Sequence, residues 1–123
     1  MKKTSLKPYN SFGVDAYASD FVIIESEKGI LEFIEKNKSK DLLVLGGGTN
    51  ILFKKNVDYP ILKINIKGVE IINEDDNEVL LSVGAGENWN ELVWWCIKND
   101  FGGLENMVSI PGNVGSAPIQ NIG

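Results

Sequence analysis

Three glycine-rich clusters are the parts of this sequence best suited to binding a ligand. The first cluster, Gly46-Gly47-Gly48-Thr49-Asn50, directly follows the apolar run 42–45. Because glycine lacks a Cβ atom and adopts positive φ, the backbone of such a loop can approach a ligand closely, and successive N–H groups can converge on an anion. The Thr49 hydroxyl and the Asn50 amide add side-chain hydrogen bonds. We therefore predict an anion-binding loop, with a tight turn that holds no ligand as the alternative.

The cluster nearest the end of the sequence, 110–118, predicts a second anion site. Pro111 is expected at the first position of a helix, where a missing N–H costs nothing. Small side chains leave one side of that helix start bare, so that its free N–H groups and its dipole attract an anion. The small residues are Gly112, Gly115, Ser116 and Ala117, and the polar residues Gln120 and Asn121 follow them. We expect the two polar side chains to address the edge of a ring system; close packing of the segment against a sheet is the alternative.

The remaining cluster, Gly84-Ala85-Gly86-Glu87-Asn88-Trp89, has features of a dinucleotide-binding fingerprint, because it follows a predicted strand and opens a predicted helix. A Rossmann turn needs a small residue at the sixth position so that helix and strand pack closely. Trp89 is the largest residue available. We therefore expect a strand-to-helix connection that borders the ligand rather than a dinucleotide site.

The composition restricts the chemistry that these clusters can support. The chain has 123 residues, a net charge of −5, twelve lysines and no arginine. An acidic chain without arginine is a poor nucleic-acid or anionic-membrane binder, and it has no bidentate guanidinium with which to clamp a phosphate. The absence of histidine removes the most common general base and most zinc-site geometries. We expect no metal, no nucleic-acid or membrane partner, and, since the single cysteine forms no internal disulfide, a cytoplasmic protein.

Apolar runs predict the strands that must position the first glycine loop. Runs at 21–24 and 42–45 are typical of buried strands, with a helix capped by Ser26 between them, and 61–66 is expected to form another short strand. The first loop therefore follows the second strand of a βαβ-like unit.

The middle of the sequence predicts antiparallel strands and a further helix. The runs 69–72 and 79–83 flank a short acidic turn, and a connection this short favours antiparallel pairing. Asn88 then caps the clearest helix, in which apolar residues recur at helical spacing from Trp89 to Ile97. The whole pattern indicates a mixed α and β protein.

Several motifs occur in the order and spacing of one known family: NSFGVDA (10–16), LGGGTNIL (45–52), VGAGENWNELV (83–93), GGLENM (102–107) and IPGNVGSAPIQNIG (110–123). The chain closely resembles the amino-terminal part of the bacterial UDP-N-acetylenolpyruvoylglucosamine reductases, also called UDP-N-acetylmuramate dehydrogenases or MurB enzymes. This resemblance covers nearly the whole chain. It implies an α+β fold: a two-lobed FAD-binding domain of the PCMH (vanillyl-alcohol-oxidase-like) type, with a small βαβ-like lobe and a lobe of antiparallel strands and helices. We expect an N-terminal arm over 1–18 and the FAD-binding domain over 19–123, incomplete at its C-terminal end.

The resemblance also implies which residues hold FAD. Gly46, Gly47, Gly48, Thr49 and Asn50 match the pyrophosphate loop of the family, and Thr49 keeps the hydroxyl of the more usual serine. The second FAD-contacting stretch is matched by Pro111, Gly112, Gly115, Ser116, Ala117, Gln120 and Asn121. The catalytic arginine, serine and glutamate of the family have no counterpart in this chain. We therefore assign no catalytic residue and expect this piece alone to be inactive and weak in FAD binding.

The reaction implied for the full-length protein is a reduction in peptidoglycan precursor synthesis. In this family NADPH reduces the flavin, which passes a hydride to UDP-N-acetylglucosamine enolpyruvate and gives UDP-N-acetylmuramate. We expect a cytoplasmic monomer. The residues themselves leave two alternatives open, a nucleotide-binding module without redox chemistry and an FAD oxidase of the same fold.

Overall fold

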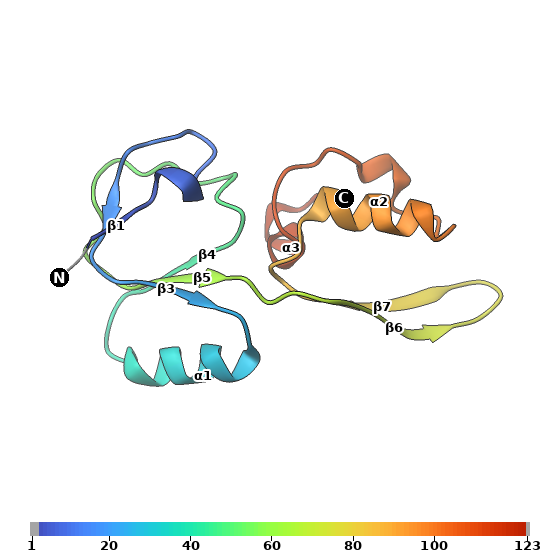
Figure 1. The fold of residues 1–123 in the computed structure, drawn as a ribbon, viewed down its shortest axis with the longest axis horizontal. Coiled ribbons are helices and arrows are strands. Elements are labelled where there is room, and N and C mark those ends of the chain that lie inside the picture. The colour runs from blue at the N-terminus through green and yellow to red at the C-terminus, as the bar shows by residue number, and fades with distance from the viewer. Residues whose placement is uncertain (1–2, 123) are drawn as a thin grey trace.

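The computed structural model describes residues 3–122 and places them in two lobes that lie side by side (Figure 1). The chain crosses from the first lobe to the second between β5 and β6. The strands are β1 (Thr4–Ser5), β2 (Tyr17–Ala18), β3 (Phe21–Ile24), β4 (Leu43–Leu45), β5 (Ile61–Ile64), β6 (Val69–Glu74) and β7 (Val79–Val83). The helices are α1 (Glu27–Lys36), α2 (Trp89–Lys98) and α3 (Ala117–Gln120), with short 3-10 helices at Lys7–Tyr9, Glu105–Met107 and Val114–Ser116.

A three-stranded parallel sheet with the strand order β3-β5-β4 forms the centre of the first lobe. These strands correspond to the predicted runs at 21–24, 61–66 and 42–45. Since β5 lies between its two neighbours, the two strands of the predicted βαβ-like unit are not adjacent. The central strand is fully buried at Ile61 and Leu62, as expected for a parallel sheet that is covered on both faces. Because the strands are parallel, β4 and β5 end at the same edge of the sheet, and the first glycine loop begins there.

Helix α1 covers one face of this sheet (Figure 1). Ser26 begins the helix as predicted, since its hydroxyl accepts a hydrogen bond from the Gly29 amide at 3.2 Å. Phe33 is buried in a cluster with Ile24 and Leu62. Removing a phenylalanine side chain from water contributes roughly 1.5–3 kcal/mol, so this contact fixes the helix on the sheet.

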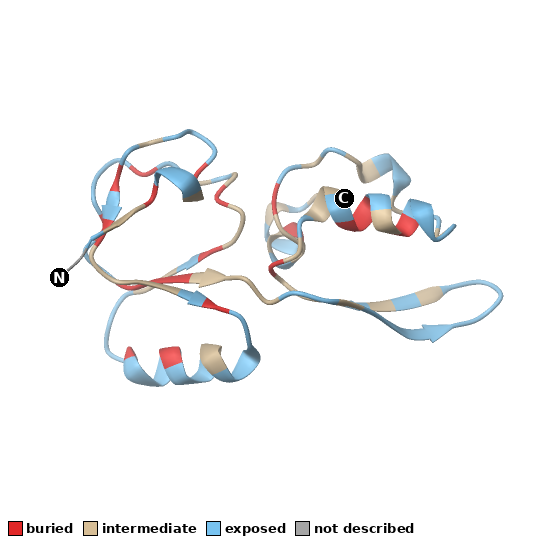
Figure 2. Ribbon diagram, viewed as in Figure 1, coloured by how far each residue is buried: buried red, intermediate tan, exposed pale blue. Residues whose placement is uncertain are grey.

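The N-terminal segment covers the opposite face. Leu6, Ala16 and Ala18 are buried in one cluster with Leu45 and Ile61. Successive side chains of a strand point to opposite faces, so Ile61 packs on the N-terminal segment while Leu62 packs on α1. Figure 2 shows buried residues on both sides of the sheet. The segment expected as an arm is therefore a structural layer of the first lobe.

The second lobe is built on the hairpin β6–β7 and on α2. The hairpin strands pair antiparallel, as predicted. Asn88 begins α2, since its side-chain oxygen accepts a hydrogen bond from the Glu91 amide at 3.1 Å. The buried residues of α2 are Leu92, Val93 and Cys96. Helices α1 and α2 have ten residues each, and no helix within residues 3–122 is long and apolar enough to cross a membrane.

Candidate functional site

The first glycine loop is held in place by the N-terminal segment. The Ser11 amide donates a hydrogen bond to the Gly48 carbonyl at 3.0 Å, and the Ser11 hydroxyl donates to the Thr49 carbonyl at 3.4 Å. Gly48 has a φ of 69°, and a Cβ atom there would collide with the carbonyl oxygen of Tyr9. Only glycine allows this conformation at so close an approach.

Asn10 fixes the N-terminal segment at the point of contact. Its side chain is buried and donates to the carbonyls of Leu6 and Val14 at 2.8 and 3.1 Å. The side-chain oxygen accepts a hydrogen bond from the Val14 amide at 2.9 Å. The first residue of the NSFGVDA motif therefore shapes the segment that supports the glycine loop.

The N–H groups of the first loop differ from its carbonyls, of which those of Gly46, Gly48 and Thr49 accept hydrogen bonds. Among residues 3–122, no group accepts a hydrogen bond from the amides of Gly46 to Asn50. Gly48 is buried, and buried backbone donors are nearly always paired. A run of unbonded donors beside a cavity is the arrangement that an external acceptor such as a phosphate would complete.

The second predicted segment lies directly against this loop. A Cβ atom on Gly47 would lie 3.2 Å from the Gly112 Cα and 3.0 Å from the Asn113 side-chain oxygen. A Cβ atom on Gly46 would lie 3.5 Å from the Ser116 Cβ. The structure therefore brings together two segments that are far apart in the sequence, and a side chain at Gly47 would push them apart.

The prediction that Pro111 starts a helix is wrong. Residues Val114–Ser116 form a 3-10 helix, and the short helix α3 begins only at Ala117, with Pro118 in its first turn. The proline that occupies an early helical position is therefore Pro118 rather than Pro111.

The expectation of free N–H groups in this second segment is also wrong, because most of its amides are bonded within the protein. The Val114 amide donates to the Glu87 carbonyl at 2.9 Å, and the Gly115 amide donates to the Ala85 carbonyl at 3.0 Å. The Ser116 amide donates to the Asn113 carbonyl at 3.0 Å, and the Ala117 amide donates to the Val114 carbonyl. A Cβ atom on Gly115 would lie 2.6 Å from the Ala85 Cβ. The glycine at 115 serves close packing, as in the alternative that the sequence left open, but the packing partner is the connection between β7 and α2 rather than a sheet.

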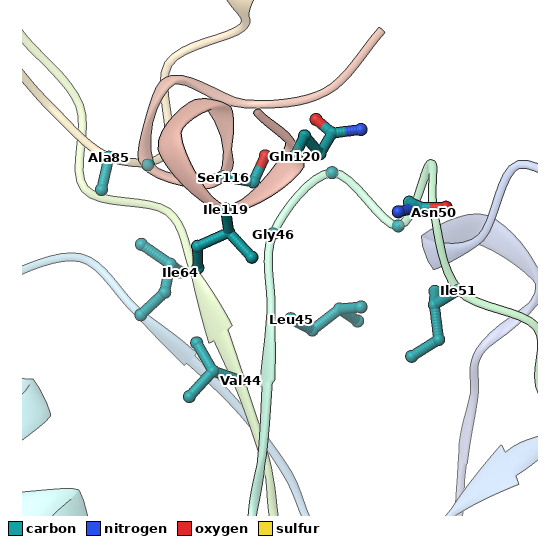
Figure 3. Close-up of a pocket in the computed structure, with 13 residues that line it drawn as sticks. Val44, Leu45, Gly46, Asn50, Ile51, Ile64, Ala85, Ser116, Ile119 and Gln120 are labelled. Atoms are coloured by element: carbon teal, nitrogen blue, oxygen red, sulfur yellow. The ribbon is translucent and has the colours of Figure 1, made fainter. Parts of the chain in front are cut away.

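A cavity of about 320 Å³ lies where the two segments meet (Figure 3). Predicted residues that line it are Gly46, Gly47, Gly48, Asn50, Gly115, Ser116 and Gln120. Thr49, Pro111, Gly112, Ala117 and Asn121 do not line it. Gly112 and Ala117 are buried, whereas Pro111 and Asn121 are exposed.

The apolar part of the lining was largely missed by sequence reasoning. It consists of Val44, Leu45, Ile51, Ile64, Ala85 and Ile119. Ala85 belongs to the cluster that was expected to border the ligand. Ile119 is 87% exposed. The sequence does offer a sign of its role, since it is a large apolar residue between proline and glutamine in a segment of mostly small residues. An apolar wall beside free amides suits a ligand that has both a flat ring and a phosphate.

Two lysines hold the connections on either side of the cavity. The Lys63 ammonium donates a hydrogen bond to the Gly46 carbonyl, and the Lys67 ammonium donates to the Gly86 carbonyl at 2.7 Å. Burial, and secondarily the charge of Lys67, lowers the pKa of Lys63. Neither lysine was singled out from the sequence, although Lys63 interrupts an apolar strand.

The other reactive side chains within residues 3–122 do not form a second centre. Cys96 is buried in α2, and burial raises the pKa of its thiol, as expected for a core residue rather than a nucleophile. In the part of the chain from residue 3 to residue 122, no group of three or more histidine, cysteine, aspartate or glutamate side chains is arranged to hold a metal ion.

Comparison with known proteins agrees with the flavin assignment. Residues 20–123 match the model of a family described as the FAD binding domain. The chain is 48% identical over 119 residues to the UDP-N-acetylenolpyruvoylglucosamine reductase of Flavobacterium johnsoniae, covering 97% of this chain. It is 49% identical over 120 residues to the enzyme of the same name from Blochmanniella pennsylvanica, covering 96% of this chain. These matches confirm the resemblance that the motifs indicated.

A solved structure supports the fold. The crystal structure of UDP-N-acetylenolpyruvylglucosamine reductase (MurB) from Thermus caldophilus is similar with a TM-score of 0.69 at 23% identity, over 94% of this chain and 40% of that one. The expected PCMH-type fold is confirmed by this likeness. The chain spans about a third of the length of the curated relatives that it matches; for the Flavobacterium johnsoniae enzyme the share is 35%.

Proposed function

This chain belongs to the family of FAD-binding domains, and we propose that it is the cofactor-holding part of a UDP-N-acetylenolpyruvoylglucosamine reductase. The unbonded amides of Gly46 to Asn50, facing no acceptor within residues 3–122, are the observation that carries this proposal. They suit the diphosphate of FAD because successive backbone N–H groups in a turn can bind phosphate without a charged side chain.

We assign the two segments different parts in holding FAD. The first loop donates its amides to the diphosphate, aided by the Thr49 hydroxyl and the Asn50 side chain. The second segment forms the opposite wall through Gly115 and Ser116, and Gly112 packs behind it against Gly47. Its remaining predicted residues are Pro111, Ala117, Gln120 and Asn121, of which Gln120 and Asn121 address the polar edge of the ring system.

The cavity encloses only part of such a cofactor. Ligand pockets commonly measure about 300–1,000 Å³, and this cavity, at about 320 Å³, is at the lower end of that range. We therefore expect residues 1–123 alone to bind FAD weakly, with the rest of the cofactor enclosed by other parts of the full-length protein.

The reaction that we propose is the NADPH-dependent reduction of UDP-N-acetylglucosamine enolpyruvate to UDP-N-acetylmuramate in the cytoplasm. Bound FAD would supply hydride transfer. The part of this chain is to bind and orient the cofactor, and we place no catalytic residue in it. We propose that the full-length enzyme acts as a monomer and serves cell-wall synthesis.

The test is an absorbance experiment on the full-length protein. We expect the purified protein to carry a flavin spectrum that NADPH bleaches and that UDP-N-acetylglucosamine enolpyruvate restores. A colourless protein that still binds ADP would favour a nucleotide-binding module instead. Reoxidation by oxygen without any effect of the UDP-sugar would favour an oxidase.

A further inference from the structure

Lys63 occupies an unusual position for a lysine. It lies on β5, the central strand of the parallel sheet, with Leu45 and Ile23 as its partners on the two sides. The strand is otherwise apolar, and Lys63 itself is half-buried. Its ammonium reaches the end of the neighbouring strand and donates a hydrogen bond to the Gly46 carbonyl.

This hydrogen bond acts on the next amide along the chain. The Gly46 carbonyl and the Gly47 N–H belong to the same planar peptide unit, and in a trans peptide the two groups point in opposite directions. No peptide bond within the described residues is cis. An ammonium that holds the carbonyl on one side therefore turns the Gly47 N–H to the other side. It also polarises the peptide, which strengthens the N–H as a donor.

The charge of Lys63 has no ion-pair partner among the described residues. Ion pairs occur at Lys28–Glu32, Lys38–Glu35 and Lys67–Glu87, but no carboxylate among residues 3–122 lies within ion-pair distance of Lys63. Partial burial and the nearby Lys67 charge both disfavour the ammonium, and its pKa is lowered accordingly. A bound anion at the neighbouring amides would supply the missing counter-charge.

We propose that Lys63 is a positioning residue for the diphosphate of the cofactor: it orients the Gly47 N–H toward the phosphate and supplies positive charge behind the glycine loop. This inference rests on the proposed function, since it takes FAD as the ligand. The positive charge of Lys63 would partly balance the two negative charges of the diphosphate, although the loop contains no arginine.

Lys67 provides a matched control because its similar bond has a different consequence. Its ammonium donates to the Gly86 carbonyl, but the following amide, that of Glu87, already donates to the Gly84 carbonyl at 2.9 Å. Its charge is paired with the Glu87 carboxylate at 3.4 Å. Lys67 therefore orients no free donor.

The experiment measures the dissociation constants of FAD and riboflavin for the full-length apoprotein by flavin fluorescence. Loss of a hydrogen bond to a charged group predicts that Lys63→Met weakens FAD binding by about 10- to 100-fold. Riboflavin, which has no phosphate, should bind to Lys63→Met within about twofold of its affinity for the wild type. Lys63→Arg should restore most of the FAD affinity, because it keeps the charge and the donor. Lys67→Met should change FAD affinity by less than about threefold.

The outcomes separate this inference from the proposed function. Wild-type protein that binds no FAD would overturn the function. Wild-type protein that binds FAD, with Lys63→Met unchanged or with FAD and riboflavin weakened equally, would overturn only the role of Lys63. If riboflavin binds too weakly to measure, failure of Lys63→Arg to recover FAD binding counts against the inference.

Discussion

The two glycine-rich segments that meet at the cavity look alike in sequence but differ in their backbone hydrogen bonds. In the first loop the N-terminal segment and Lys63 engage the carbonyls, and the amides of Gly46 to Asn50 stay unbonded within residues 3–122. In the second segment the amides of Val114 to Ala117 are bonded to protein carbonyls. The first segment is therefore a donor surface, whereas the second is a closely packed wall.

This difference shows what glycine contributes in each place. In the first loop, glycine permits a left-handed turn and leaves donors free, as at Gly48. In the second segment, glycine removes a side chain so that Gly115 can pack on Ala85. Substitutions in the two segments should therefore affect different properties, cofactor affinity in the first and stability in the second.

The largest effect is expected for Gly48→Ala. Alanine at a φ of 69° costs about 1–2 kcal/mol, and its Cβ would collide with the Tyr9 carbonyl, so the loop or the N-terminal segment must move. We expect FAD affinity to fall by about 100-fold and the thermal midpoint to fall by several degrees. Flavin fluorescence titration and thermal unfolding measure the two changes.

The control for this change is Gly102→Ala. A Cβ atom there meets nothing within 4 Å. Wild-type behaviour of Gly102→Ala, beside a damaged Gly48→Ala, would show that the effect is local. Unchanged FAD binding in Gly48→Ala would mean that the first loop is not the donor surface.

A smaller effect is expected for Gly47→Ala. The new Cβ would lie 3.2 Å from the Gly112 Cα and 3.0 Å from the Asn113 side-chain oxygen, so the two segments must separate by a few tenths of an ångström. We expect about tenfold weaker FAD binding, with a smaller loss of stability than in Gly48→Ala. Isothermal titration calorimetry on the full-length protein would measure it, and unaltered affinity would show that the spacing of the segments does not matter.

For the second segment we expect the reverse pattern, which Ser116→Ala tests. The Ser116 hydroxyl donates to the Asn113 carbonyl at 2.8 Å and accepts from the Asn113 amide at 3.3 Å. Losing it should reduce the free energy of unfolding by about 1 kcal/mol and change FAD affinity by less than about threefold. Denaturant unfolding measures the change in the free energy of unfolding, and FAD titration measures the change in affinity. An affinity loss as large as that of Gly47→Ala would remove the distinction between the segments.

The smallest effect lies outside both segments, in the hairpin turn. The amides of Asn77 and Glu78 donate to the Asp75 carboxylate, and these bonds lower its pKa below the ordinary 3.8. A lowered pKa in the folded state means that the carboxylate stabilises the turn above about pH 4, and that this contribution is lost as the pH falls through the folded-state pKa. Asp75→Ala should therefore lower the urea midpoint at pH 6 more than at pH 3, with no change in FAD binding. Asp76→Ala, in the same turn, serves as the control.

Local patterns in the sequence predicted much of the fold. Ser26 and Asn88 were identified as helix caps because they precede apolar residues at helical spacing, and both accept the expected hydrogen bonds. The apolar runs marked the parallel strands and the hairpin. These features depend on residues within a few positions of one another, which is why they can be read without coordinates.

The site was harder to predict because it depends on distant partners. The amides of Val114 and Gly115 could have been free or bonded, and the carbonyls of Glu87 and Ala85 decide the outcome. The contact of Lys63 with the first loop cannot be predicted from local sequence, because only the pairing of β4 with β5 brings its ammonium to the Gly46 carbonyl. The motifs located the glycine loops, but not which of the two keeps its N–H groups free of internal hydrogen bonds.

The bonds of Ser11 to the glycine loop also bear on how the site is assembled during folding. The Ser11 hydroxyl and the Thr49 carbonyl are 38 positions apart, so this bond can form only when the N-terminal segment lies over the glycine loop. The first glycine loop therefore gains these two supports only when the N-terminal layer has docked on the sheet. Deleting the first twelve residues should therefore weaken FAD binding by the full-length protein, even though none of residues 3–12 lines the cavity.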